Sequence, residues 1–434
     1  MTMISNATSG LMATQVVMNA ISNNVANSDT DGYSRQTVTL SSLVSGGVSV
    51  SSVDRQTSFY LSQQTWTTTS DVGYYTSYSE YATYLEELMS SDSLDVTTSL
   101  TTFYSALEAA SSSPDDDSLR TAVLTDAEAV CDAVNSLAGY MDELQGQIDS
   151  QIGSTLSTVN DLASQVAALN DKIVALQSSG GDTSSLEDSR DAAITSLSEL
   201  VDISTVAQDD GSYTISLPQG QTLVSGNKSG SLDYASDTGL TLTYGKQTSR
   251  VNEEMSGSLG GLLAFSSEVL EPTQESLNEL AATIADEFNA LQTTGYDLNS
   301  SAGTELFSYD SADAASTLAI ADDFSGDDLA FAGSASAGTG DNTNLLSMLD
   351  LQGDQEDTYT ALVTKLGLVS SQASSALTTS SSLQSSLQDS LSSISGVNLD
   401  EEAANLVSYQ NIYSANSKVL TVADELFDTV LNMF

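Results

Sequence analysis

Apolar residues near the N-terminus recur at alternating steps of three and four residues. Thr14 fills the one gap in the row, and its apolar members are Ile4, Ala7, Leu11, Met18, Ile21 and Val25. This spacing is typical of a coiled-coil seam. Serine, threonine and asparagine cover the other face with almost no charge, and an isolated helix of this kind is marginal in water. We therefore expect a helix over residues 4–25 that needs a partner helix.

The C-terminal part of the chain offers that partner. A strict seven-residue row is formed by Leu399, Leu406, Tyr413, Leu420, Phe427 and Phe434, with Ala403, Ala423 and Val430 beside it. A heptad row of this kind predicts a second amphipathic helix. Because neither terminal helix has a natural place in a compact globule, we expect the two to pair in a coiled coil.

A third and longer seam lies between the two ends. It runs through Val134, Leu137, Met141, Leu144, Ile148, Ile152, Val159, Leu162, Val166, Leu169, Ile173 and Leu176. One helix of about 65 Å accounts for it. The segment "SSSPDDDSLR" predicts a helix start with Ser113 as the cap and Pro114 in the first position. Further helices are expected over 72–91, 94–111, 262–292 and 356–393.

The periodicity changes between residues 201 and 250, where apolar and polar residues alternate around Asp-Gly and Gln-Gly turns. This pattern predicts β-hairpins. Residues 300–350 are rich in Ala, Ser, Asp and Gly, and we expect a small β-rich insertion there. The predicted fold is mainly α. Its domains are a terminal assembly domain (1–60 plus 395–434), a long helical domain (61–200, 251–299 and 351–394), attached β-hairpins (201–250) and a small variable outer domain (300–350).

Composition narrows the range of functions. The chain has 10 Lys and Arg against 59 Asp and Glu, a formal charge of −49, so nucleic acid and anionic membranes are poor partners. It has no histidine, which excludes histidine-based triads and zinc sites, and its one cysteine, Cys131, excludes an intrachain disulfide. No catalytic, cofactor or metal site is predicted, although Asp297, Asn299 and Glu305 faintly resemble an incomplete calcium loop.

No apolar stretch approaches the roughly 20 residues that span a bilayer. The first 20 residues also lack the positive region of a secretory signal peptide. We therefore expect a soluble protein which, if it leaves the cell, does so by another route.

The polar turn behind the first helix, "NNVANSDTDGYSRQ", has two interpretations. Its asparagines can end a helix, Asp31 and Gly32 make a tight turn, and Arg35 can bind carboxylates. It is either an ordinary loop or a docking elbow, in which case we hypothesise that Arg35 bridges to an acidic group between subunits. The candidate interface residues are Asn24, Asn27, Gly32, Tyr33 and Arg35 in the turn, and Leu11, Met18, Ile21, Leu406, Tyr413, Leu420 and Phe427 in the seams.

The same turn resembles a motif of the bacterial flagellar axial family, the rod, hook and hook-associated proteins. The family pattern A-N-x-x-T-x-G-Y/F-x-R falls on Ala26, Asn27, Thr30, Gly32, Tyr33 and Arg35. Residues 169–226, 256–299 and 396–434 are also similar to that family, in its order, and most of all to its hook-associated members. The match fades over 300–350, and the acidity is unusual for the family.

The resemblance implies a structural, self-assembling protein at the junction between hook and filament, and not an enzyme. Its expected partners are further copies of itself, hook protein, a second hook-associated junction protein, and a cytoplasmic export chaperone on the C-terminal helix. The family leaves the cell through the flagellar type III channel without a cleaved signal peptide and functions outside it. A charge of −49 on each copy leads us to expect that assembly needs salt or divalent cations.

Two alternatives stay open at this point. A hook or distal rod protein would share the N-terminal motif but lack the long 134–176 helix. An acidic secreted adhesin would expose a large central β-domain, and a secreted hydrolase would show a pocket of converging carboxylates.

Overall fold

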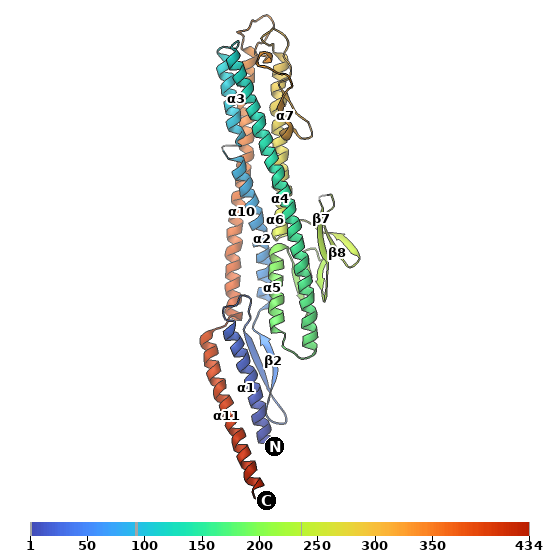
Figure 1. Ribbon diagram of the computed structural model, residues 1–434, viewed down its shortest axis with the longest axis vertical. Helices are drawn as coiled ribbons and strands as arrows, with labels where there is room; N and C mark the ends of the chain where they lie inside the picture. The colour runs from blue at the N-terminus through green and yellow to red at the C-terminus, as the bar shows by residue number, and fades with distance from the viewer. Residues whose placement is uncertain (1, 92–93, 236, 434) are drawn as a thin grey trace. The chain divides into compact units, whose positions relative to one another are not determined.

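The computed structural model describes residues 2–91, 94–235 and 237–433. Helices predominate (Figure 1). The chain forms two compact units, and each is described by itself. The first comprises Met1–Tyr74, Thr155–Gly260 and Thr378–Phe434, and the second comprises Tyr75–Ser154 and Gly261–Leu377.

The two terminal helices of the first unit, α1 (Thr2–Ala26) and α11 (Leu399–Leu431), lie side by side, which confirms that the chain ends pair (Figure 1). Their supercoiling stays a prediction. The stripe that α1 buries differs from the predicted one, because it consists mostly of small residues: Ala7, Gly10, Ala13, Thr14, Val17, Ala20, Ile21 and Asn24. The larger Ile4 and Val25 are 38% and 42% exposed.

Close approach of the two helices explains the small residues. A Cβ atom at Gly10 would lie 2.9 Å from the Asn416 side-chain nitrogen of α11. A hairpin of β1 (Gln36–Ser42) and β2 (Val48–Arg55), which was not predicted, also packs against α1. Apolar and polar residues do alternate in its strands, at Val38 and Leu40 and at Val48 and Val50, on either side of the Gly46-Gly47 turn, so the sequence carried a hairpin signal that was missed.

The helices α2 (Phe59–Met89), α3 (Val96–Ser111) and α4 (Asp117–Ser178) confirm the predicted helices. α2 begins earlier than the expected residue 72, and α4 joins the predicted helix start near Pro114 and the seam over 134–176 in one helix. The predicted cap Ser113 is wrong. The carboxylate of Asp116 accepts hydrogen bonds from the backbone N–H groups of Ser118 (2.9 Å) and Leu119 (3.3 Å). Pro114 stays outside the helix, where its carbonyl accepts a hydrogen bond from the buried Arg120.

The seam of α4 is buried as predicted. All of its twelve predicted positions are buried except Leu162 and Leu176, which are half-buried. After α5 (Ser184–Leu200), the chain forms the predicted β-hairpins as two antiparallel sheets. Their strands are β3 (Ser204–Ala207), β4 (Tyr213–Ser216), β5 (Thr222–Ser225) and β6 (Lys228–Ser229), then β7 (Ser231–Ala235), β8 (Gly239–Tyr244) and β9 (Gln247–Arg250).

Two asparagines of α4 hold these sheets in place. The Asn160 side chain donates to the Leu232 carbonyl (2.9 Å) and accepts from its N–H (2.7 Å), as a neighbouring strand would. Asn170, which is fully buried, does the same for the backbone of Tyr213 and Gly226. Both sheets are therefore fixed to the helix by side chains that replace strand partners.

The predicted helix over 262–292 is present as α6 (Ser258–Phe265), the π-helical turn η1 (Ser266–Leu270) and α7 (Glu271–Thr294). Pro272 explains the wider turn. Its ring lacks an N–H and would collide with the carbonyl four residues earlier in a regular α-helix. The π-turn lets the chain pass the proline without breaking the helix.

Residues 300–350 belong to the second unit and contain less strand than predicted. Their elements are β10 (Phe307–Ser308), α8 (Ala314–Thr317), β11 (Ala319–Ile320), the 3-10 turn η2 (Gly326–Asp328) and α9 (Thr343–Leu349). The segment is held by side chains from helices: Phe307 packs against Phe103 and Phe288, with ring centroids 6.5 and 5.7 Å away.

Arg120 of α4 holds residues 326–329 of this segment by hydrogen bonds to their backbone. Its Nε donates to the Pro114 carbonyl (2.6 Å), and its NH1 group donates to the carbonyls of Gly326 (2.9 Å) and Leu329 (2.8 Å). The guanidinium lies 4.5 Å from the centre of the Phe331 ring. Burial lowers the pKa of Arg120, yet its partners are carbonyls, which suit a cation without requiring a buried carboxylate.

The last long helix before the C-terminus, α10 (Gln352–Ser395), confirms the helix predicted over 356–393. Its Gln355 joins three helices of the second unit. The side-chain oxygen accepts from the Tyr104 hydroxyl of α3 (2.7 Å), and the side-chain nitrogen donates to Glu287 of α7 (3.2 Å). The side chain is 2% exposed, so its polar groups are satisfied inside the bundle.

Candidate functional site

The turn between α1 and β1, residues 23–36, is here called the terminal elbow. At its centre lies Asn24, which is 1% exposed. Its Oδ1 accepts hydrogen bonds from the Gln36 N–H and the Tyr33 hydroxyl (both 2.8 Å), and its Nδ2 donates to the Gln36 carbonyl (3.0 Å). Asn24 therefore pairs with Gln36 as a strand partner would, and it fixes the end of the helix to the start of the hairpin.

The rest of the turn has the predicted local geometry. Asn27 continues the helix end, because both its N–H (3.0 Å) and its Nδ2 (2.9 Å) donate to the Asn23 carbonyl. Gly32 has a φ of +75°, the left-handed conformation that glycine adopts at little cost. The turn closes with a hydrogen bond from the Tyr33 N–H to the Thr30 carbonyl (3.2 Å).

Arg35 ties the elbow to the base of α11. Its Nε donates to Glu402 (2.7 Å), its NH2 group lies 3.2 Å from Glu401, and its backbone N–H donates to the Ser395 carbonyl (2.9 Å). Glu402 is 1% exposed. In the described chain its carboxylate partners lie in the same molecule, so Arg35 has an internal role, and the hypothesis that it bridges between subunits stays a prediction.

The position of those glutamates has a local cause. Asn398 caps α11 by accepting from the N–H groups of Asp400 (3.0 Å) and Glu401 (3.3 Å), and three acidic residues occupy the first turn. Negative charge is favourable there because the helix dipole is positive at its N-terminus. Arg35 therefore places its positive charge beside the carboxylates of the first turn of α11.

A second arginine, Arg55 at the end of β2, is 5% exposed at its side chain and meets three carboxylates at the start of α5. Its Nε contacts Glu187 (2.9 Å), and its NH1 group contacts Asp188 (2.6 Å) and Asp191 (3.0 Å). Burial acts to lower the pKa of Arg55, but the three carboxylates outweigh it and raise the pKa. Burial raises the pKa of Asp191, whose second oxygen has no hydrogen-bond partner among the described residues.

The two arginine clusters meet at the elbow. Asp188, which binds Arg55, also accepts from the Ser34 N–H (3.3 Å). Tyr33 lies between the clusters: burial, and then the charges of Asp188 and Glu402, raise its pKa to about 12. The phenol thus stays neutral and keeps its proton on the hydrogen bond to Asn24.

Arg190 is a further buried cation that sequence reasoning missed. Its guanidinium lies 3.5 Å from the centre of the Tyr213 ring, and its NH1 group donates to the Gly211 carbonyl (2.7 Å). Burial lowers its pKa. The segment "LEDSRDAA" places Arg190 among acidic residues of α5, which predicts ion pairs. The fold shows instead that its side chain lies against the hairpin that contains β4.

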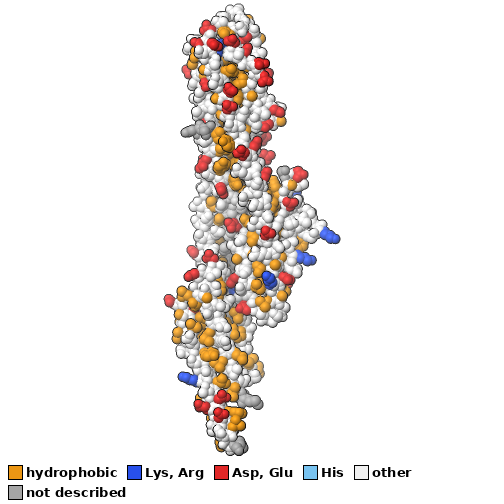
Figure 2. Space-filling model, in the orientation of Figure 1, with side chains coloured by type: hydrophobic (Ala, Val, Ile, Leu, Met, Phe, Trp, Pro, Cys, Tyr) orange, Lys and Arg blue, Asp and Glu red, His pale blue; other side chains and the backbone are white. Residues whose placement is uncertain are grey.

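The predicted seam residues divide into two groups. Ile21 is buried, and Leu11, Met18, Leu406 and Leu420 are half-buried, so these lie in or beside the contact within the chain. Tyr413 and Phe427 are 39% and 60% exposed, and Phe434 lies outside the described residues. Figure 2 shows hydrophobic side chains over the region where Figure 1 draws α1 and α11. The large exposed apolar residues of α11 are Leu399, Val407, Ile412, Tyr413, Val422, Leu426, Phe427, Val430 and Leu431.

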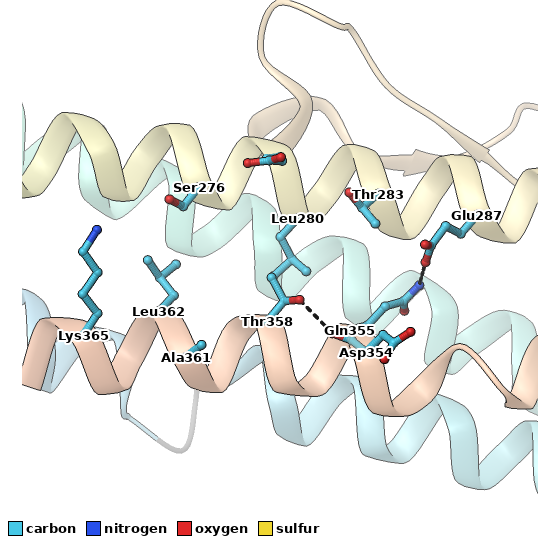
Figure 3. Close-up of a pocket in the computed structure, with 11 residues that line it drawn as sticks. Ser276, Leu280, Thr283, Glu287, Asp354, Gln355, Thr358, Ala361, Leu362 and Lys365 are labelled. Carbon is cyan, nitrogen blue, oxygen red and sulfur yellow. Dashed lines mark hydrogen bonds between the residues drawn. The ribbon is translucent and has the colours of Figure 1, made fainter.

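A pocket of about 470 Å³ lies between α7 and α10 (Figure 3). In the close-up Glu287 points toward Gln355, and their hydrogen bond closes one end of the pocket. The wall combines Leu280 and Leu362 with hydroxyl and acidic groups, and it offers Lys365 as a cation. The described lining holds no pair of a nucleophile and a hydrogen-bonded base.

No group of three or more acidic or cysteine side chains in the described chain is placed to hold a metal ion. The candidate calcium loop has another explanation. The Oδ1 of Asp297 accepts from the N–H groups of Asn299 (2.8 Å) and Ser301 (2.7 Å), which makes it the first residue of a turn. Across residues 2–91, 94–235 and 237–433, no helix is both long and apolar enough to cross a membrane.

Three models of known protein families match parts of the chain. The family model described as "Flagellar hook-associated protein FlgK helical domain" matches residues 82–307. The chain belongs to the FlgK family of flagellar hook-associated proteins. Two further models match its ends: "Flagella basal body rod protein" over residues 4–33, and "Flagellar basal body rod FlgEFG protein C-terminal" over residues 388–433. The first of these ends within the terminal elbow.

Individual relatives agree with the family. Flagellar hook-associated protein 1 of Salmonella typhimurium is 28% identical over 99% of both chains, and that of Bacillus subtilis is 24% identical over 99% of this chain and 97% of its own. The solved structure of the flagellar hook junction protein FlgK from Burkholderia pseudomallei matches with a TM-score of 0.53 and 27% identity. That match covers 57% of this chain and 47% of the solved chain.

These matches confirm the prediction of a structural flagellar axial protein at the junction between hook and filament. They favour the hook-associated group over hook and distal rod proteins, because the helical-domain model covers the long helices α3 and α4. The family is structural, which leaves the adhesin and hydrolase alternatives without support.

Proposed function

We propose that copies of this chain assemble side by side into a ring at the hook–filament junction, through the apolar faces of α1 and α11. One face of the ring binds hook protein, and the other binds a second hook-associated junction protein. The observation that carries the proposal is the exposure of α11. Of its 33 residues, only Glu402 and Ala423 are buried.

A helix with so many apolar side chains in water needs further cover. Exposed apolar patches of this kind mark protein–protein contacts. Leu426 and Leu431 are 56% and 60% exposed. The elbow supports the proposal, since Arg35 binds the base of α11 to the turn after α1, so that both helices present one surface to a neighbour.

The same exposed face accounts for the other proposed partner. Before assembly, a cytoplasmic export chaperone covers the C-terminal helix, because bare apolar side chains would associate too early. The chain then passes unfolded through the flagellar type III channel without a cleaved signal peptide and acts outside the cell. Its single cysteine forms no intrachain disulfide that would hinder unfolding. Its role is mechanical, and we propose no catalytic activity.

The charge of the chain adds a condition for assembly. Like subunits of charge −49 repel one another, and the range of this repulsion falls from about 10 Å at 0.1 M salt to about 3 Å at 1 M. We expect assembly to require salt or divalent cations. Sedimentation of the purified protein over a series of salt concentrations measures this, and an equal yield at low and high ionic strength would refute it.

The proposed ring contact is tested with Leu426→Asp/Val430→Asp in a flagellated cell that has no other copy of the protein. We expect hooks without filaments, because charges on the exposed face prevent neighbours from packing. The control is Leu346→Asp, which is 49% exposed in α9, an element of the second unit. Normal filaments on cells with the double variant would contradict the proposal.

A further inference from the structure

The few cations of this chain are unevenly distributed. Of the 10 Lys and Arg residues, the four arginines Arg35, Arg55, Arg120 and Arg190 are engaged inside the protein, as described above. The six others are exposed: Lys172, Lys228, Lys246, Arg250, Lys365 and Lys418. Internal contacts explain the first group but not the second.

Three of the six exposed cations lie in residues 221–252, here called the basic lobe, which contains β5 to β9. They are Lys228, Lys246 and Arg250, and the lobe has only two carboxylates, Asp233 and Asp237. Its formal charge is therefore +1, while the rest of the chain carries −50. Figure 2 shows Lys and Arg side chains on the part that projects where Figure 1 draws β7 and β8.

The local fold presents these cations outward. Lys246 follows Gly245, whose φ of +66° makes the tight turn between β8 and β9. Arg250 ends β9, an edge strand whose residues are all exposed, and Lys228 begins β6, the edge strand of the other sheet. Within the described residues none of the three forms a salt bridge. Glu253 directly follows the lobe in the sequence, and its carboxylate accepts a hydrogen bond from the Leu240 N–H of β8 (3.2 Å), so it offsets one of these positive charges.

We propose that the basic lobe is a docking surface for the acidic surface of a neighbouring copy of this chain. The inference rests on the proposed self-assembly, and it adds the surface at which two copies attract each other. Charge complementarity selects the partner: a surface that holds three of the six exposed cations on one copy faces a chain that carries −50 elsewhere. A single exposed ion pair contributes little, but attraction at one place in a generally repulsive pair fixes the orientation in which copies meet.

A second reading of the same residues must be separated by experiment. Charged side chains on edge strands also prevent strands of different molecules from pairing. A glutamate blocks edge pairing as well as a lysine does, but it cannot bind an acidic neighbour. Replacement of a cation by glutamate therefore distinguishes a docking surface from edge protection.

The test compares Lys246→Glu with Lys365→Glu in the purified full chain. Each change removes one exposed lysine and alters the net charge by the same amount, but only Lys246 lies in the lobe. In moderate salt we expect Lys246→Glu to raise the critical concentration for assembly about threefold, and the triple variant with Lys228→Glu and Arg250→Glu about tenfold or more. Lys365→Glu should change it by less than about 1.5-fold, and raising the salt should shrink the differences.

Zero-length cross-linking gives a direct readout of the contact. Copies of natural isotope composition are mixed with copies labelled with ¹⁵N, assembled, and treated with a carbodiimide that joins lysines to carboxylates. We expect mixed-isotope cross-links from Lys228 and Lys246. The proposal is overturned if those links are missing, or if Lys246→Glu assembles as Lys365→Glu does.

Failure of the wild-type chain to assemble at any salt concentration would refute the proposed function, and this inference with it. Assembly of the wild type with no effect of lobe substitutions would refute this inference alone. Thermal unfolding followed by circular dichroism checks that each variant is folded, which we expect because all three side chains are exposed.

Discussion

Helices α4 and α11 carry the same kind of apolar seam but meet opposite environments. In α4 the seam is buried along nearly its whole length, and Leu137 and Ile148 are fully covered. In α11 the corresponding row is half-buried at Leu406 and Leu420 and 60% exposed at Phe427. A heptad row thus predicts a helix with an apolar face, but it does not say whether that face is covered inside the molecule.

The difference follows from how many neighbours each helix has. In the first unit α4 is bound to both small sheets through Asn160 and Asn170. In the second unit it bonds to η1 through Gln145 and to α7 through Asp142. The neighbour of α11 in the described chain is α1, whose facing stripe consists of small residues. A helix that packs against a single neighbour with small facing side chains keeps most of its surface in water.

The difference in burial between the seams of α4 and α11 is tested most directly by placing the same charge on both. We expect Ile148→Asp to reduce the free energy of unfolding by more than about 4 kcal/mol, since it buries an unpaired carboxylate. Phe427→Asp should change it by less than about 0.5 kcal/mol in the monomer, because that side chain is already in water. Urea denaturation of dilute protein measures both, and equal effects would show that α11 is as well covered as α4.

Arg55 gives the next largest effect, because it holds the hairpin beneath α1 to α5. We expect Arg55→Met to cost about 3–5 kcal/mol of unfolding free energy, since it leaves three carboxylates without their cation. Arg55→Lys should cost less, because the charge is kept although the fork of hydrogen bonds is lost. The exposed Arg250→Met is the matched control, and a similar stability of all the variants would contradict this account.

The pair formed by Arg35 and Glu402 sharpens the comparison, because it is the buried charged contact that attaches α11 to the elbow. In a double-mutant cycle of Arg35→Met with Glu402→Gln, we expect a coupling free energy of about 1–2 kcal/mol. Glu401 is the internal control. Its side chain is 56% exposed, so its coupling to Arg35 should stay below about 0.5 kcal/mol. Equal couplings would show that burial of Glu402 does not matter.

The smallest expected effect depends on pH and on Tyr33. Its pKa is about 12 in the folded protein and 10.0 without the protein environment, so the unfolded chain loses the proton first. The stability that the neutral phenol contributes is complete below pH 10 and is lost as the pH rises toward 12. We expect wild type to exceed Tyr33→Phe by about 1 kcal/mol at neutral pH. That gap should close between pH 10 and 12, and a constant gap would refute the prediction.

The elbow shows how far sequence reasoning reached and where it stopped. The turn at Gly32 and the helix end at Asn27 follow from local chemistry, and both are present. The partner of Arg35 was assigned to another subunit, but Glu402 lies 367 positions along the same chain. Sequence spacing carries no information about such a pair, because it exists only once α1 and α11 are brought together.

The same limit applies to residues 300–350. Their composition resembles that of short strands and turns, and they hold little regular structure. What fixes them is a cation from α4 and aromatic side chains from α3 and α7. A segment held mainly by side chains of other elements has no periodicity of its own to read.

The sequence by itself determined the long helices, the hairpins after α5, the turn at Gly32 and the kinship with flagellar axial proteins, because each rests on the order of neighbouring residues. Only the tertiary structure decided which seams are covered and which carboxylates bind Arg35 and Arg55. Those outcomes depend on distances between residues that are far apart in the chain, and only folding sets such distances.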